Sequence, residues 1–324
     1  MRQATHAELS TALRSRNALH EDGMTDRLIS RELSAGVLVK VRRGWYINGA
    51  LWRQLWNESR HVALLIAVWR DASTSKPVFS HASAAVLWGL PWYGRLEPRA
   101  HVVVGDADRS SAPDVFRHEG SLPDEDCYVI HGMQCTALAR TLADVARTAR
   151  SEPGIAVADA AFQLVAGQPR HYDESAAEVW RDELQRRFEV RGGRGIRIAR
   201  RLIDIADGRA DRPGESVSRL QLHRLGFARV RPQVHVPGPT GDYWVDFAID
   251  DAQAFGEFDG KAKYLDEAMR SGLTLEEVLL KEKRREDWIR GTTGRRFVRW
   301  ESGDISSPAR LGARLASFGV MPPR

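Results

Sequence analysis

Three carboxylates and a lysine recur at short spacing in the C-terminal third of the chain. Asp246 falls in one expected strand, residues 242–249, and Glu257, Asp259 and Lys261 alternate along the next run. Because side chains along a strand alternate between two faces, the last three share one face, on which Asp246 can converge. Clustered carboxylates repel one another unless a cation lies between them. The spacing predicts a divalent-metal site with Asp246, Glu257 and Asp259 as ligands.

Lysine usage points to the same region. The chain has 48 lysines and arginines together, of which only six are lysines, and four of the six lie between residues 261 and 283. An ammonium group, unlike a guanidinium, can be tuned to orient or deprotonate water. We expect Lys261 to be the electrophilic or water-orienting cation, with Lys283 as its substitute. Both lysines could instead bind phosphate. The two strands that carry the carboxylates could also be an edge hairpin whose charges are only solvated.

A glutamate opens the helix expected upstream of these strands. Pro213-Gly-Glu-Ser begins an amphipathic run that Gly226 ends, which places Glu215 in the first helical turn. A glutamate there is favoured by the helix dipole alone. Its place in the chain, before Asp246 and Glu257, gives the order helix Glu, strand Asp, strand Glu and makes Glu215 a further catalytic candidate.

Residues 212–305 resemble the very-short-patch-repair (Vsr-like) endonucleases, a branch of the PD-(D/E)XK superfamily. The resemblance is carried by Glu215-Ser216, Val245-Asp246-Phe247, Glu257-Phe-Asp259-Gly260, and a basic helix at 281–290 followed by a strand at 296–300. It implies a restriction-endonuclease-like αβββαβ core that uses Mg²⁺, or Mn²⁺, to hydrolyse phosphodiester bonds. In the E-x-K place Asp259 stands for lysine, unless Asp259-Gly-Lys261 fills it, and Lys261-Ala-Lys263 stands where histidines often follow.

The N-terminus has the pattern of a winged helix. Thr25 can cap a helix that ends at Gly36, and residues 37–41 and 45–47 read as a hairpin turned at Arg42-Arg43-Gly44. Arg27 and Arg31 are four residues apart and share a helix face that suits a major groove. Arg42 and Arg43, without an evident acidic partner, suit phosphate or minor-groove contacts. A solvated basic face is the alternative.

Residues 5–150 resemble the AbiEi family of antitoxins, winged-helix proteins of bacterial type IV toxin-antitoxin systems. The resemblance rests on the hairpin pattern, on Ser80-His81-Ala-Ser-Ala-Ala-Val-Leu-Trp-Gly-Leu and on Thr136-Ala-Leu-Ala-Arg-Thr-Leu-Ala-Asp144. It implies DNA binding, commonly autorepression, no enzymatic activity in this half, and a cognate toxin or another defence-system protein as partner. We predict that His81 is a capping or packing residue.

The fold class expected is α/β, mixed and multidomain. We predict a winged-helix DNA-binding domain at 1–50, an AbiEi-like mixed α/β domain at 51–150, a basic helical connector at 151–211 and a nuclease-like domain at 212–324. In the second domain, His101–Val104 and Cys127–Ile130 read as strands, and the polar stretch Gly105–Glu119 reads as a loop.

Composition limits the partners and the compartment. The net charge of +5 favours a polyanion. The chain has no run of eighteen apolar residues and no hydrophobic signal core, so we expect a cytoplasmic protein without membrane contact. Two cysteines are too few for a disulfide framework.

Two functions remain open. The first is a DNA-binding, divalent-metal-dependent endonuclease in phage defence, restriction or repair, with Lys281 and Lys283 contacting DNA beside the site. The second is a non-enzymatic, antitoxin-like transcriptional regulator whose nuclease domain is degenerate. The set of five site residues favours the first, and the absence of E-x-K in its usual register favours the second.

Overall fold

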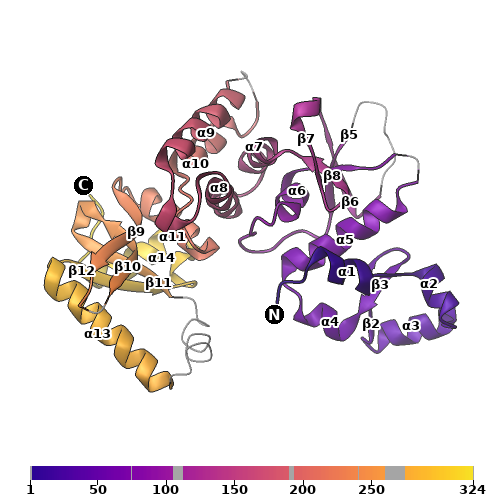
Figure 1. Ribbon diagram of the computed structural model, residues 1–324, viewed down its shortest axis with the longest axis horizontal. Coiled ribbons are helices and arrows are strands. Elements are labelled where there is room, and N and C mark those ends of the chain that lie inside the picture. The colour runs from indigo at the N-terminus through magenta and orange to yellow at the C-terminus, as the bar shows by residue number, and fades with distance from the viewer. Residues whose placement is uncertain are drawn as a thin grey trace. The chain divides into compact units, whose positions relative to one another are not determined.

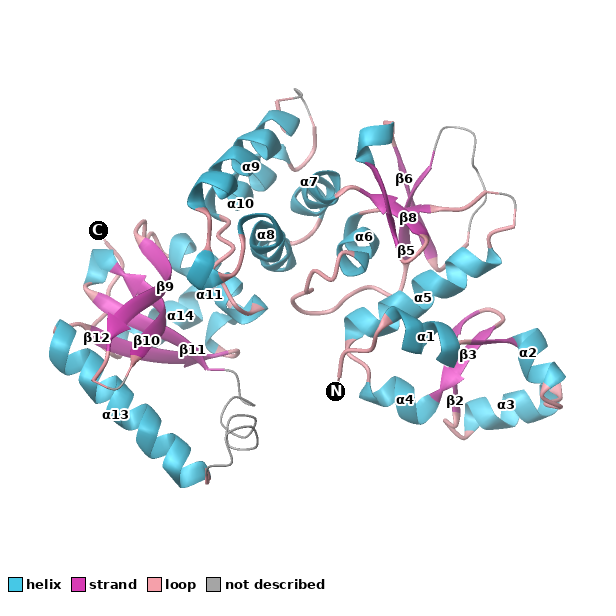
Figure 2. Ribbon diagram, viewed as in Figure 1, coloured by secondary structure: helices cyan, strands magenta, loops and turns pink. Residues whose placement is uncertain are grey.

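The computed structural model describes residues 2–73, 75–104, 112–189, 193–239, 241–259 and 274–323. The protein is mixed α/β, and its described residues form three sheets and a set of helices (Figure 1, Figure 2). The chain divides into two compact units, Met1–Ala149 with Val190–Ala199, and Arg150–Glu189 with Arg200–Arg324.

The first unit begins with a small sheet and short helices. Its elements are α1 (His6–Ala12), β1 (Arg14–Ser15), α2 (Arg16–Glu21), α3 (Asp26–Ser34), β2 (Leu38–Arg42), β3 (Trp45–Asn48) and α4 (Gly49–Gln54), with strand order β1-β3-β2. Thr25 caps α3, since its hydroxyl accepts from the Leu28 amide at 3.3 Å. Gly44 adopts φ +80° at the turn between β2 and β3, a backbone conformation that favours glycine. The predicted capped helix and hairpin are therefore confirmed.

The remainder of the first unit is a five-stranded sheet with helices. Its elements are α5 (Asn57–Asp71), β4 (Val78–Phe79), α6 (His81–Leu87), β5 (Ala100–Val104), β6 (Val115–Glu119), η1 (Asp124–Asp126), β7 (Cys127–Ile130), β8 (Met133–Thr136) and α7 (Leu138–Thr148). The strand order is β6-β5-β4-β8-β7, with β5 parallel to β6. One apolar core joins this sheet to α1 and α5, through residues such as Leu9, Leu65 and Phe79.

The predicted loop Gly105–Glu119 is wrong in its second half. Residues 105–111 lie outside the described residues, but Val115–Glu119 forms strand β6. Its partner β5 runs parallel to it, with Ala100 opposite Val115 and Val104 opposite Glu119. Pairing with a distant strand overrides the weak local pattern, because strand preference depends on neighbours more than on the residues alone.

The second unit opens with helices that pack on one another. These are α8 (Ser151–Ala166), η2 (Pro169–His171), α9 (Glu174–Arg187), α10 (Ile196–Ile205, whose first residues belong to the first unit) and α11 (Pro213–Arg224). Arg219 of α11 donates to Asp159 of α8, and both side chains are buried. Residues 151–166 are therefore packed against the helix that carries Glu215.

A four-stranded sheet completes the second unit. Its elements are β9 (Val230–Pro237), β10 (Asp242–Ile249), η3 (Asp250–Ala252), β11 (Ala254–Asp259), α13 (Leu275–Thr293), β12 (Arg296–Glu301), η4 (Asp304–Ser306) and α14 (Pro308–Ala316). The strand order is β12-β11-β10-β9; β9, β10 and β11 are antiparallel, and β12 is parallel to β11. From α11 to β12 the described elements of this unit thus run helix, three strands, helix, strand.

The two faces of this sheet are covered by different helices, α11 and α14 on one and α13 on the other (Figure 1). Phe247 stacks on Trp300, whose indole N–H donates to Ser218 of α11 at 2.8 Å. On the other face, Val245 belongs to an apolar cluster with Ile289 of α13. Val245 and Phe247 therefore lie on opposite faces, although simple alternation along a strand would place both on one face.

The alternation fails because the sheet is irregular at Asp246. Opposite it in β9, Gln233 has φ +48°, and the backbone pairs between β10 and β11 end at Phe247 and Gly256. Beyond that pair, the Phe258 amide donates to the Asp246 carboxylate at 2.9 Å. The Phe258 amide thus bonds to a side-chain carboxylate instead of a backbone carbonyl. The alternation of side chains between the two faces of β10 is disturbed at this point.

Within the described ranges, each helix is too short or too polar to cross a bilayer.

Candidate functional site

Glu215 is a buried carboxylate at the start of α11. It is 5% exposed and accepts from the Asp211 amide at 2.9 Å and from the Gln233 side-chain amide at 3.2 Å, both at Oε2. Burial, and then the negative charge of Asp246, raise the pKa of Glu215 well above its ordinary 4.5. The two acids lie far apart in the sequence, and the negative charge of one disfavours ionisation of the other. Such an arrangement is expected at a site that holds a proton or a cation.

Asp246 is the second member of this pair. It lies in β10, is half-buried, and accepts the Phe258 amide, so the backbone of β11 fixes its carboxylate. The structure thus brings Glu215 and Asp246 together, as their order in the sequence suggested. We call these two residues the acidic pair.

Glu257 and Asp259 lie on the other side of the sheet, among arginines. Glu257 is 1% exposed; Arg285 of α13 donates to its Oε1 at 2.6 Å, and Arg299 of β12 lies 3.2 Å from its Oε2. Arg299 also lies 3.6 Å from Asp259 and 2.9 Å from Glu282. Guanidinium groups therefore balance the two carboxylates that were predicted to balance a metal ion.

The described residues do not bring the predicted ligands together as one group. Among them, the set of three side chains with ligand atoms within 4.8 Å of one another consists of histidines, not of Asp246, Glu257 and Asp259. Lys261 and Lys263 lie outside the described residues. The three-carboxylate site therefore stays a prediction.

The lysines expected to contact DNA lie on the outside of α13. Lys281 and Lys283 are exposed, whereas Glu282, Arg285 and Ile289 of the same helix turn towards the sheet. Lys283 is thus directed away from Glu257, and its described position suits a phosphate contact better than a catalytic one.

The arginines of α3 and of the β2–β3 hairpin differ in exposure. Arg27, Arg31 and Arg43 are exposed, and the Arg31 side chain, 74% exposed, lies 3.3 Å from Glu32. Arg42 was expected to have no acidic partner, which is wrong. Its side chain is 12% exposed, and its Nε lies 2.9 Å from Asp114. Asp114 comes from a distant part of the chain, so sequence spacing gave no sign of this ion pair.

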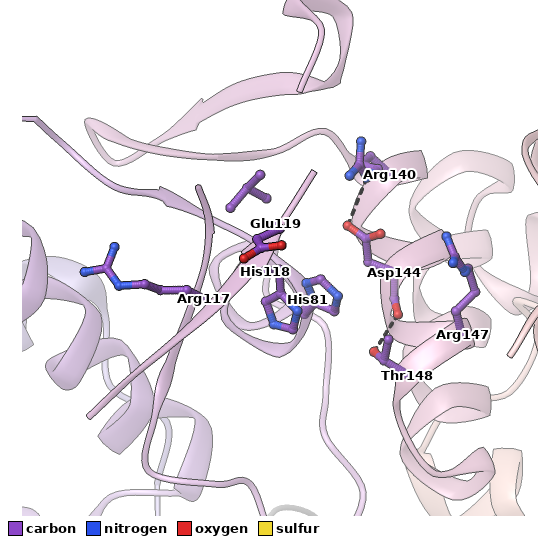
Figure 3. A pocket seen from close by; sticks show the side chains of 9 residues that line it. His81, Arg117, His118, Glu119, Arg140, Asp144, Arg147 and Thr148 are labelled. Atoms are coloured by element: carbon purple, nitrogen blue, oxygen red, sulfur yellow. Dashed lines mark hydrogen bonds and ion pairs between the residues drawn. The ribbon is translucent and has the colours of Figure 1, made fainter. Parts of the chain in front are cut away.

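A cavity of about 400 Å³ in the first unit is a site that sequence reasoning missed. It is lined by His81, Val103, Arg117, His118, Glu119, Arg140, Asp144, Arg147 and Thr148. Figure 3 shows the rings of His81 and His118 on one side and Arg140, Asp144, Arg147 and Thr148 of α7 on the other. Arg140 donates to Asp144 at 3.0 Å and to Asp126 at 3.1 Å.

His81, His101 and His118 form a cluster at the edge of this cavity, here called the histidine cluster. The rings of His81 and His118 stack with centroids 3.5 Å apart, and His101 Nδ1 lies 2.9 Å from His118 Nε2. Burial is the main cause that lowers the pKa of His81 to about 2 and those of His101 and His118 to about 4. All three rings are therefore neutral near pH 7.

The predicted packing role of His81 describes only part of its environment. It is the first residue of α6, is buried, and has φ +50°, which is uncommon outside glycine. Its partners stand 20 and 37 positions further along the chain, on β5 and β6. No local motif links them, and one of them fell in a stretch predicted to be a loop.

Comparison with known proteins gives limited guidance. No protein-family model matches the chain. Two uncharacterized proteins of Mycobacterium tuberculosis, MT2308 of strain CDC 1551 / Oshkosh and Rv2248 of strain ATCC 25618 / H37Rv, are similar to it, each 31% identical over 200 residues. The similarity covers 58% of this chain and 62% of each relative, so the chain spans less than two thirds of the relatives it matches.

Proposed function

We propose that the protein binds DNA and that its second unit is a divalent-metal-dependent endonuclease with a restriction-endonuclease-like core of the Vsr-like branch. The observation that carries this proposal is the acidic pair: Gln233, opposite Asp246 in the sheet, donates to Glu215, and the charge of Asp246 raises the pKa of Glu215. The order helix, three strands, helix, strand supports it further.

The acidic pair fits a hard divalent cation. Its oxygens are the ligand type that Mg²⁺ and Mn²⁺ prefer, and a cation would favour the ionised form of Glu215 that burial and Asp246 disfavour. Glu257 fits less well, because Arg285 and Arg299 already balance it. Asp246 and Glu215 would therefore hold the ion. When bound, it lowers the pKa of water and neutralises charge developing on the phosphate.

Exposed basic side chains support the DNA-binding part of the proposal. We propose that residues 1–50 act as a winged helix, with Arg27 and Arg31 of α3 facing the DNA and Arg43 at the wing tip. In the second unit, Lys281 and Lys283 give α13 a basic outer side beside the sheet. Such contacts fix register on the phosphate backbone and carry no sequence information themselves.

Cleavage by purified variants tests this function. The full chain is incubated with plasmid and oligonucleotide DNA, with Mg²⁺, with Mn²⁺ or with chelator. We expect Asp246→Asn and Glu215→Gln to lose cleavage while still binding DNA. Asp242→Asn, on the same strand and with a side chain 68% exposed, is the matched control and should cleave normally. Full cleavage by Asp246→Asn would reject the site.

A second function is favoured by the arginine pairs of Glu257. If those guanidiniums permanently take the place of a metal, the second unit is a binding module, and the protein is an antitoxin-like DNA-binding regulator with a toxin or another defence-system protein as partner. In that case the full chain retards DNA from upstream of its own gene, and every variant and metal leaves the DNA intact.

A further inference from the structure

The histidine cluster combines three features that a chance group of side chains does not share. Its members come from three different elements, the start of α6, β5 and β6. One ligand nitrogen from each lies within 4.8 Å of the other two. Two of its members, His81 and His118, also line a cavity of about 400 Å³.

The hydrogen bonds of the rings indicate which nitrogens are available. His101 Nδ1 and His118 Nε2 face each other at 2.9 Å and share one proton, which a cation between the two rings would replace. His81 uses Nδ1 to contact the Ser80 hydroxyl at 3.0 Å, which leaves its Nε2 as a ligand. A hydroxyl partner of this kind fixes the tautomer of a metal-binding histidine.

We propose that His81, His101 and His118 form a site for a first-row transition-metal ion, Zn²⁺ by its ligand chemistry, with one coordination position open to the cavity. Three imidazoles and an open position are a recurrent zinc arrangement. Imidazole nitrogens favour Zn²⁺ over Mg²⁺, which takes oxygen ligands. This site belongs to the first unit and is independent of the acidic pair.

Side chains of both charges line the cavity beside the cluster. Arg117, Arg140 and Arg147 line it, and of these Arg140 is balanced by Asp126 and Asp144. Glu119 also lines the cavity and adds negative charge at the open side.

Titration with Co²⁺, a visible probe for zinc sites, tests the proposal on the full, tag-free chain after removal of metals by chelator. We expect one Co²⁺ per chain with the strong visible absorption of four-coordinate geometry, and its displacement by one equivalent of Zn²⁺. His101→Ala and His118→Ala should each weaken binding by at least about 100-fold, and Ser80→Ala by about tenfold.

Two controls make the outcome decisive. His6→Ala removes a histidine from another stacked pair of the same unit, His6 with His131 at 4.7 Å, and should leave binding unchanged. Asp246→Asn, in the acidic pair, should also leave it unchanged. Thermal unfolding of each metal-free variant shows whether it is folded, and Zn²⁺ should raise the melting temperature of the wild type but not of His101→Ala.

Three results would overturn the proposal: no Co²⁺ uptake by the wild type, uptake that His101→Ala and His118→Ala retain while folded, or uptake that Asp246→Asn abolishes. The last would assign the metal to the acidic pair. The experiment measures metal binding and not DNA cleavage. Its result therefore tests the zinc site independently of the proposed nuclease.

Discussion

Arg219 of α11 and Asp159 of α8 form an ion pair in which both side chains are buried, 2% and 1% exposed. The pair lies one helical turn after Glu215 and ties the helix of the acidic pair to α8. Burial raises the pKa of Asp159, against the opposing effect of Arg219. The position of Glu215 thus depends on a contact between residues 60 positions apart.

Removing one partner of this pair should destabilise the second unit strongly. We expect Asp159→Asn or Arg219→Met to lower the free energy of unfolding by about 3–5 kcal/mol, because each leaves a buried charge without its partner. Arg229→Met, whose side chain is 71% exposed beside Asp251, should cost far less, because solvent screens an exposed ion pair. Urea unfolding followed by circular dichroism measures both, and equal effects would contradict this account.

The acidic pair predicts a pH dependence of stability. The pKa of Glu215 is higher in the folded state than in the unfolded state. At a pH between these two values, the folded state keeps a proton on Glu215 that the unfolded state has lost. Stability is therefore lost as pH rises from about 4.5 through the folded pKa. Glu215→Gln should not show this loss, and near pH 8 it should be more stable than the wild type by over about 1 kcal/mol.

Urea unfolding of both proteins between pH 4 and 8 measures the difference. Glu174→Gln, whose side chain is 73% exposed on α9, is the control and should follow the wild type. A Glu215→Gln curve parallel to that of the wild type would show that the pair does not compete for charge.

Two glycines of the second unit should respond in opposite directions to alanine. An added Cβ at Gly256 would lie 2.1 Å from the Trp300 ring, so Gly256→Ala should cost about 1–3 kcal/mol through overpacking. At Gly291 in α13 nothing lies within 4 Å of an added Cβ. Gly291→Ala should therefore stabilise by about 0.5–1 kcal/mol, the helix preference of alanine. A melting temperature that falls for both would refute the packing argument.

Arg42 and Arg43 of the hairpin should differ in their contribution to DNA binding. Arg43 is exposed, so Arg43→Ala should reduce the slope of log affinity against log salt by about one phosphate contact. Arg42 is held by Asp114 and Asp71, so Arg42→Ala should leave the slope unchanged and lower stability instead. Fluorescence anisotropy at several salt concentrations measures both, and an unchanged slope for Arg43→Ala would place the DNA surface elsewhere.

The sequence predicted what local patterns control. The strands 242–249 and 127–130 have the predicted bounds, because the alternation of apolar and polar residues is a local property. The mixture of expected strands and helices in one chain also predicted the mixed α/β class. The capped helix after Thr25 followed from a side chain and an amide three residues apart.

What the sequence did not predict depends on distant partners. Asp114 pairs with Arg42, and Arg299 with Glu257, although nothing in their spacing indicates it. Strand β6 is stabilised by its pairing with β5. The irregular alternation of side chains at Asp246 depends on a hydrogen bond to the backbone of the neighbouring strand. A carboxylate pattern on a strand predicts which side chains share a face, but not whether a metal or a guanidinium meets them there.

The arginine beside Glu257 offers the last test of the predicted metal ligands. Arg299 lies within 4 Å of carboxylate oxygens of Glu257, Asp259, Glu282 and Glu286. Arg299→Met removes its charge and leaves these buried and half-buried acids to repel one another, so we expect a loss of about 3–5 kcal/mol. If Glu257 and Asp259 can act as ligands, millimolar Mg²⁺ or Mn²⁺ should restore much of this stability, because an ion that binds only the folded state stabilises it. Arg310→Met, at the exposed start of α14, should show neither the loss nor the rescue. A destabilised Arg299→Met that divalent ions do not rescue would assign Glu257 and Asp259 to the arginine network alone and leave metal binding to Glu215 and Asp246.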